Sequence, residues 1–214
     1  MKWLKNTILF LGSILLYLHI YIHFKISIFN EFANIDDVCK EKIMSTIYYK
    51  LPFVFDGTTI IKTLDEKKEK DRRKIYKKLY ENLPMLEPSV RFFTNDTIYE
   101  LKKGKHIEVH RNLECRNFYM VHSGKVIVYC IHPKYKDNMN LDIKIDKINK
   151  IDKNIEFIEN NSEILRIELY PNSILFVPNY WFIYVKALEK SVVEKVQYKT
   201  ILNEVNFLHA KYLK

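Results

Sequence analysis

The second half of the chain alternates apolar and polar residues with a period of two, a pattern that predicts short β-strands. From Arg91 onward these segments are separated by turn residues more often than by helices. The predicted strands are Lys105–Arg111, Asn117–Met120, Lys125–His132, Leu165–Leu169, Ser173–Pro178 and Val192–Ile201. A tight turn at His122–Gly124 joins the second and third of them. Many short strands with few helices predict a mainly β fold, a double-stranded β-helix or jelly roll.

The N-terminal end has a different pattern, a continuous apolar run. Thr7–Phe24 contains eighteen residues without a formal charge. As a helix this run would be roughly 27 Å long, close to the ~30 Å thickness of a bilayer core. A cleaved signal peptide and a helix packed on the domain are the alternatives. The run is longer than a usual signal core, and no small-x-small cleavage site follows it. The sequence therefore predicts a transmembrane signal-anchor over residues 1–28.

The charges around this run predict its orientation. Lys2 and Lys5 precede it, and only Lys25 closely follows it. The positive-inside rule then places the N-terminus in the cytosol and the domain on the lumenal or external side of a single-pass membrane protein. On that side the sequons Asn95–Thr97 and Asn160–Ser162 would be open to glycosylation. Such triplets also arise by chance in a chain this rich in asparagine.

Residues 29–89 form a predicted helical and extended flank. Asn30–Tyr49 has helical spacing, with an inward stripe of Ile35, Val38, Ile43 and Ile47. Leu51–Phe55 is a predicted strand, closed by the turn residues Asp56–Gly57. Asp65–Lys78 is a predicted solvated helix that Leu79, Leu83 and Leu86 would dock and that Pro84 and Pro88 would end.

The barrel itself is predicted to occupy residues 90–201. It is interrupted at 135–163 by a segment rich in Lys, Asp, Asn and Ile that has no clear period. This segment is interpreted as a surface insertion, either a docking surface or an expansion without function. A short helix is predicted at 202–214.

Composition narrows the function. The chain is 48% hydrophobic and 14% aromatic, as expected of a folded protein. The net charge is +9, but Lys supplies 29 of the 35 basic residues, as in chains from AT-rich genomes. Nucleic-acid readers depend on Arg, which is scarce here, so a nucleic-acid partner is disfavoured. A nucleic-acid or lipid-binding stripe remains an alternative at Lys67, Lys68, Arg72 and Arg73. Three cysteines without a CxxC motif argue against a zinc site or a disulfide scaffold.

Two stretches carry a resemblance to a known family. Glu108–Pro133 reads EVHRNLECRNFYMVHSGKVIVYCIHP, and Glu168–Val185 reads ELYPNSILFVPNYWFIYV. Together they resemble the core of cupin-like relatives of JmjC domains, as encoded by large DNA viruses or protists, over roughly Val90–Tyr198. The family pattern is His-x-Asp, then Asn-Phe, then Gly with a Lys two residues on, and finally Pro-x-x-Trp-Trp-His. Active members are Fe(II)/2-oxoglutarate oxygenases.

By this resemblance the metal site is degenerate. His110 takes the first histidine position, Asn112 stands where the family has a carboxylate, and Ile183 stands where it has the last histidine. An amide is a neutral ligand, and an alkyl group cannot bind a metal.

The co-substrate site is also altered. Val126 replaces the lysine that pairs with 2-oxoglutarate, although Asn117 is kept. Lys125 would point away from the barrel, because neighbouring strand residues face opposite sides.

The predicted strand Lys105–Arg111 suggests an alternative metal site. His106, Glu108 and His110 alternate with apolar residues, so they are predicted to share one face of a strand. The outer two would then be about 13 Å apart, too far to bind one ion without a third element. The chain also lacks GxSxG, P-loop and GxGxxG motifs.

The sequence therefore predicts a membrane-anchored, non-catalytic pseudoenzyme with a cupin-like, JmjC-like barrel. It would bind or scaffold a protein partner and need no cofactor. The alternative is an Fe(II)/2-oxoglutarate-dependent hydroxylase with a rewired site built on His110, Asn112 and a third ligand.

Overall fold

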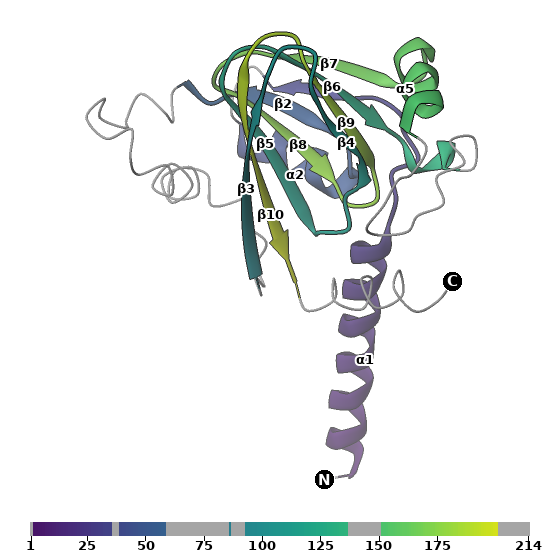
Figure 1. Cartoon of the computed structure of the whole chain (residues 1–214). Coiled ribbons are helices and arrows are strands. Elements are labelled where there is room, and N and C mark those ends of the chain that lie inside the picture. Colours follow the sequence, from purple (N-terminus) through teal and green to yellow (C-terminus); the bar gives the residue numbers. More distant parts are fainter. Residues whose placement is uncertain (1, 36–38, 59–85, 87–92, 137–150, 201–214) are drawn as a thin grey trace.

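The computed structural model describes residues 2–35, 39–58, 86, 93–136 and 151–200. Its centre is a pair of facing β-sheets (Figure 1). The six-stranded sheet has the order β1-β2-β8-β5-β10-β3 and contains β1 (Ala33–Ile35), β2 (Phe53–Asp56), β8 (Ser173–Pro178), β5 (Arg116–Ser123), β10 (Ser191–Lys199) and β3 (Phe93–Leu101). The four-stranded sheet has the order β4-β9-β6-β7 and contains β4 (His106–Arg111), β9 (Phe182–Ala187), β6 (Val126–Ile131) and β7 (Leu165–Leu169).

The strand order is that of a jelly roll. From β3 to β10 the chain crosses to the other sheet at every connection except that between β6 and β7. Apart from the parallel pair β1 and β2, the paired strands are antiparallel. This arrangement confirms the predicted mainly β, jelly-roll fold, and each of the six strands predicted in the second half overlaps an observed one, with ends that differ by up to three residues. Strands β3 and β9 were not predicted.

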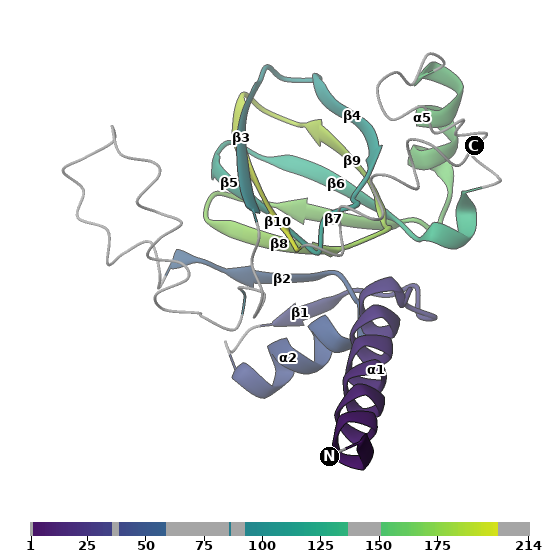
Figure 2. The same ribbon diagram turned by 90° about the horizontal axis from the view of Figure 1, so that it is seen from below.

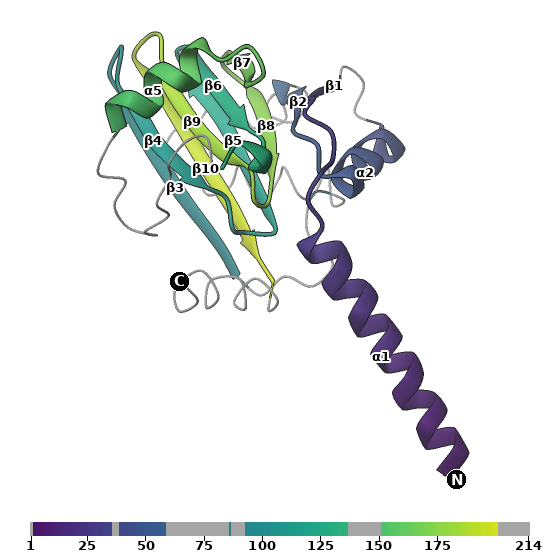
Figure 3. The same ribbon diagram turned by 90° about the vertical axis from the view of Figure 1, so that its right-hand side faces the viewer.

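Apolar side chains fill the space between the sheets, and both outer faces are covered as well. The inner cluster includes Tyr119, Val126, Trp181, Ile183 and Val193. Helix α2 (Lys40–Tyr49) packs Ile43 on the outside of the six-stranded sheet. Helix α5 (Ile151–Asn160) packs Ile158 on the outside of the four-stranded sheet. The views in Figures 2 and 3 place these two helices on opposite sides of the barrel. Strand β6 is buried along its whole length, which explains its unbroken apolar sequence.

Two predictions are corrected in the flanking segments. The helix predicted over Asn30–Tyr49 begins only at Lys40, because Ala33–Ile35 pairs with β2 and buries Ile35 in the cluster beneath α2. The segment 135–163 is not without structure: it begins within a short 3-10 turn, Pro133–Tyr135, and contains α5. The predicted Asp65–Lys78 helix, residues 137–150 of the insertion and the predicted C-terminal helix at 202–214 lie outside the described residues.

Helix α1 (Lys2–Phe24) extends away from the barrel (Figure 3). Most of its large apolar side chains are exposed, and Trp3 is 80% exposed. Among the described residues, however, no helix has both the length and the apolar character needed to cross a bilayer. The predicted transmembrane helix is therefore not supported. Tyrosine and histidine recur toward the C-terminal end of the run, at Tyr17, His19, Tyr21 and His23, and they reduce its apolar character.

Candidate functional site

A β-bulge in β4 turns His110 into the barrel. Ile107 pairs with Val185 and His110 pairs with Ile183, so three steps along β4 match two steps along β9. The extra residue reverses the alternation of the strand: Ile107 belongs to the inner cluster, whereas Val109 packs in the outer cluster.

Hydrogen bonds fix the protonation of the His110 ring. Nδ1 lies 2.8 Å from the backbone oxygen of Glu108. Because a carbonyl oxygen only accepts, Nδ1 carries the proton and Nε2 keeps its lone pair. Nε2 is the nitrogen that faces Tyr119, at 3.1 Å from its hydroxyl.

Lys195 from β10 is the donor to that lone pair. Its Nζ lies 2.8 Å from His110 Nε2 and 5.5 Å from the centre of the Tyr119 ring. The lysine is buried, with 6% of its surface exposed. Burial lowers the pKa of Lys195 to about 8, although the nearby Glu114 acts in the opposite direction. Burial, together with the Lys195 charge, lowers the pKa of His110 to about 3. The imidazole is therefore neutral at physiological pH.

Asn112 completes this group from the loop after β4. Its backbone is held by Trp181 and Tyr180, because its N–H donates to the Trp181 oxygen and its oxygen accepts from the Tyr180 N–H. The side-chain oxygen of Asn112 accepts from the Tyr119 hydroxyl at 3.1 Å. Its Nδ2 is buried and, within the described part of the chain, has no hydrogen-bond partner. We call His110, Asn112, Tyr119 and Lys195 the polar cluster.

The remaining positions implied by the resemblance are Ile183, Val126 and Asn117. The first two lie among apolar side chains, and Asn117 has polar partners. Ile183 is fully buried and pairs directly with His110 across β4 and β9. Val126 is buried in the inner cluster. Asn117 is buried near the Val177 backbone and accepts a hydrogen bond from Gln197 at 3.2 Å.

Lys125 lies outside the barrel, as its place in the strand predicted. Its Nζ forms an ion pair with Glu168 at 2.7 Å and lies 4.7 Å from the centre of the Tyr170 ring. It is therefore engaged at the surface and does not reach into the barrel toward Val126, the position to which the resemblance assigns the family's lysine.

The alternative metal site is not assembled. The bulge separates His106 from His110: the His106 ring lies 5.6 Å from that of Tyr184, in the outer cluster, while His110 faces the interior. The prediction that His106, Glu108 and His110 share one face is therefore wrong. Over the residues that the structure describes, no group of three or more His, Cys, Asp or Glu side chains is placed to hold a metal.

The polar cluster does not fit the Fe(II) and 2-oxoglutarate that the resemblance implies. A metal on His110 Nε2 would have to displace the Lys195 amine, and no carboxylate belongs to the polar cluster. Ile183 offers only alkyl carbons beside the ring.

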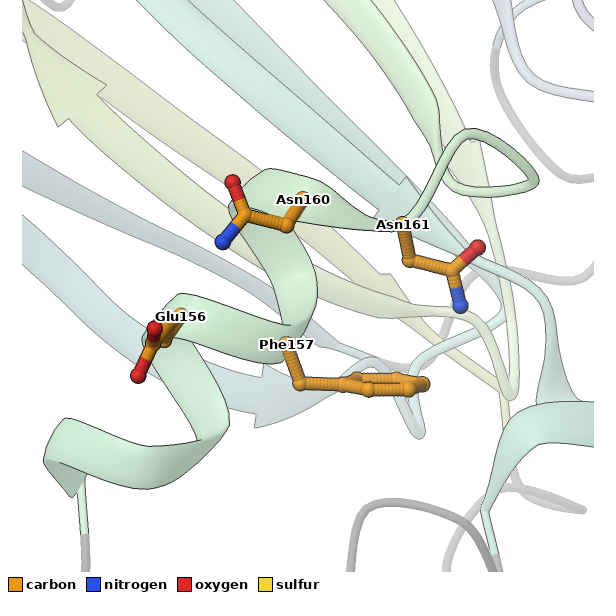
Figure 4. A pocket seen from close by; sticks show the side chains of 4 residues that line it. All are labelled: Glu156, Phe157, Asn160 and Asn161. Atoms are coloured by element: carbon orange, nitrogen blue, oxygen red, sulfur yellow. The ribbon is translucent and has the colours of Figure 1, made fainter.

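A hollow of about 460 Å³ lies elsewhere, at the end of α5 (Figure 4). It is lined by Glu156, Phe157, Asn160 and Asn161. These residues come from one helix and the residue after it, and they converge on no common point.

The resemblance names His110, Asn112 and Ile183, but it names neither Lys195 nor Tyr119, whose polar atoms lie within 3.1 Å of His110 Nε2. In the sequence pattern these two residues are ordinary strand residues. One signal was present: Lys195 and Gln197 alternate with Glu194, Val196 and Tyr198, so they point to the same side as Val193.

Comparisons with known proteins add a likeness of fold. No family model matches the sequence, and no curated protein matches it. A cupin superfamily protein from Desulfitobacterium hafniense is 10% identical with a TM-score of 0.33, over 53% of this chain and 72% of that one. A conserved protein of unknown function from Streptococcus pyogenes is 13% identical with a TM-score of 0.34, over 51% and 67%. A protein from Bacillus halodurans is 10% identical with a TM-score of 0.33, over 50% and 62%. These TM-scores are too low to support an argument, so the jelly-roll assignment depends on the strand order alone.

Proposed function

We propose that this chain is a non-catalytic, JmjC-like relative of the cupins that binds or scaffolds another protein while helix α1 holds it at a membrane. In this proposal the barrel is a pseudoenzyme. Its former metal site is a metal-free polar cluster, and its partner docks at the barrel mouth or at the insertion.

One observation carries the non-catalytic part of this proposal: the Lys195 amine occupies the metal-binding atom of His110. Nζ to Nε2 is a 2.8 Å hydrogen bond, and the neutral imidazole has no other lone pair to offer. A bound cation would have to remove Lys195 from this bond and then tolerate its positive charge nearby.

The neighbouring side chains support the same reading. Ile183 cannot ligate a metal, and the oxygen of Asn112 already accepts the Tyr119 proton. An oxygenase site needs two histidines and a carboxylate on one face of the iron, with open positions beside them. Of these ligands, only His110 is present in the polar cluster.

Helix α1 supports the membrane part of the proposal. It exposes a long series of Leu, Ile, Phe and Tyr side chains, and Lys5 and Lys25 flank this apolar stretch. Apolar surface of this extent on a helix is covered by lipid or by another protein. The proposal is attachment to a membrane, whether the helix inserts or lies at the interface.

A protein is the proposed partner because the chain is poorly suited to nucleic acid. Only 6 of its 35 basic residues are arginine, the residue that reads bases and phosphates through paired hydrogen bonds. No observation favours the alternative hydroxylase over the binding module.

Metal content tests the non-catalytic proposal. The full chain is purified in detergent, incubated with Fe(II) or Zn²⁺, desalted and submitted to elemental analysis. We expect less than about 0.1 ion per chain, because Lys195 blocks the ligand atom of His110. One ion per chain that disappears in His110→Ala but persists in His106→Ala would overturn the non-catalytic proposal. His106→Ala is the matched control, because it removes a histidine of the same strand that faces outward.

A further inference from the structure

The exposed apolar surface of this protein is concentrated in one region. Of the 23 large hydrophobic side chains that are exposed among the described residues, 21 lie between Trp3 and Tyr49, and the others are Ile98 and Tyr170. Helix α1 accounts for only part of this set. Seven members lie beyond it, and we call them the junction patch: Ile26, Ile28, Phe29, Phe32, Met44, Tyr48 and Tyr49.

The junction patch adjoins the end of α1. Lys25 follows the last residue of that helix, and its Nζ lies 4.5 Å from the centre of the Tyr48 ring and 5.6 Å from that of Tyr49. The two tyrosine rings pack edge to face at 5.4 Å. Met44 and Tyr48 are one helical turn apart on α2, beside the face that buries Ile43. The apolar surface of α1 therefore continues onto the folded domain.

Direct hydrogen bonds tie this region to the barrel. The Ser27 oxygen accepts from the ring of His132 at 2.8 Å. The Asn30 side chain donates to the Glu163 backbone at 2.6 Å. Lys50, which ends α2 in a left-handed conformation, donates to Asn179 at 2.8 Å from a buried side chain. The patch is thus held in a fixed orientation relative to both sheets.

We propose that the junction patch lies on the head-group region of the same membrane that receives α1, and so fixes the orientation of the barrel on the bilayer. This inference rests on the proposed membrane attachment and goes beyond it by naming a second lipid contact. Tyrosine, phenylalanine and lysine together suit the boundary between head groups and acyl chains, since each has an apolar body and the tyrosine and lysine ends are polar.

The proposed contact determines which side of the barrel faces the lipid. Helix α2 packs on the outside of the six-stranded sheet, so that sheet is turned toward the bilayer. Helix α5 covers the opposite sheet and faces away from it, as the placement of α1, α2 and α5 in Figures 2 and 3 illustrates.

Fluorescence quenching by brominated lipid tests this orientation in the full chain. The background variant Trp3→Phe leaves only Trp181, which is buried in the barrel. The probe variant adds Tyr48→Trp to this background, and the matched control adds Tyr170→Trp. Both tyrosines are 51% exposed, and Tyr170 directly follows β7 of the four-stranded sheet. The chains are bound to vesicles of phosphatidylcholine and phosphatidylserine brominated near the head-group end of the acyl chains.

We expect the tryptophan at position 48 to lose about half of its emission, and the one at position 170 to lose almost none. Tyr49→Trp serves as a second probe if the first variant misfolds. Equal, weak quenching at both positions in chains that float with vesicles would overturn the orientation and leave attachment by α1 intact. Failure of the wild-type chain to float with vesicles would overturn the membrane attachment itself.

Discussion

At the level of single residues, Lys195 and His110 share a hydrogen bond in which the amine donates to the only free lone pair of the imidazole. Burial lowers the pKa of His110, and the positive charge of Lys195 lowers it further, because two positive charges in a buried site repel. Burial also lowers the pKa of Lys195; Glu114 acts in the opposite direction, but no ion pair joins Lys195 to a carboxylate within the described residues. The polar cluster is thus arranged around a neutral histidine.

This arrangement predicts that acid destabilises the protein through His110. Its pKa is about 3 in the folded state and about 6.5 when unfolded. Between these values the unfolded chain binds a proton that the folded chain does not, so stability is lost as pH falls from about 6.5 toward 3. For this partly buried ring we expect a loss on the order of 2 kcal/mol between pH 7 and pH 4. The measurement is urea unfolding of wild type and His110→Gln across that range.

The His110→Gln variant should show a shallower loss, since it has no group at this position to protonate. Equal slopes for both proteins would contradict the account.

In Lys195→Met, the repulsion on the imidazole disappears and the pKa of His110 should rise toward its ordinary value. NMR titration of the ring protons measures that rise directly.

The sequence predicted part of this cluster. The resemblance assigned His110 and Ile183 to two ligand positions of one site, and these two residues are paired across the sheet. It did not predict Lys195, because a lysine in an alternating strand is usually exposed, and this lysine is buried against His110 of the opposite sheet, 85 residues away in the chain.

At the level of elements, periodicity predicted six of the eight strands from β3 to β10, and it failed at an irregular one. The bulge between Ile107 and His110 adds one residue to β4, which exchanges the inward and outward faces of the strand. Strict alternation therefore misassigned His106 and Glu108. Helix α5 was not predicted because it lies in an insertion rich in Lys, Asp, Asn and Ile, although Ile155 and Ile158 have the spacing of an apolar helical stripe.

The turn between β5 and β6 provides a prediction at this scale. Gly124 has φ of +76°, and a Cβ there would meet the Lys190 oxygen and approach the Ser191 Cα to 2.8 Å. Gly104 has nearly the same φ, +77°, but open space around it. We expect Gly124→Ala to lower the free energy of unfolding by at least about 3 kcal/mol, and Gly104→Ala to lower it by about 1 kcal/mol. Chemical denaturation of both variants measures the difference, and equal losses would show that backbone conformation alone determines the cost.

At the level of the whole molecule, the jelly roll buries the polar cluster between its sheets, and most of the exposed large apolar side chains among the described residues lie between Trp3 and Tyr49. The composition and strand pattern were sufficient to predict the fold. The junction patch could not be predicted, because Lys25 and Tyr48 come together only when β1 and α2 pack against the outside of the six-stranded sheet. In the sequence they resemble ordinary residues of an amphipathic flank.

The central claim is that Lys195, and not a metal, occupies the Nε2 atom of His110. The most direct test is the ¹⁵N NMR spectrum of the imidazoles in the full chain at neutral pH, before and after one equivalent of Zn²⁺ or Fe(II). The account predicts that His110 is neutral with its proton on Nδ1, and that neither metal changes its Nε2 resonance. A metal-induced shift or loss of the His110 Nε2 signal, while that of His106 is unchanged, would contradict the account.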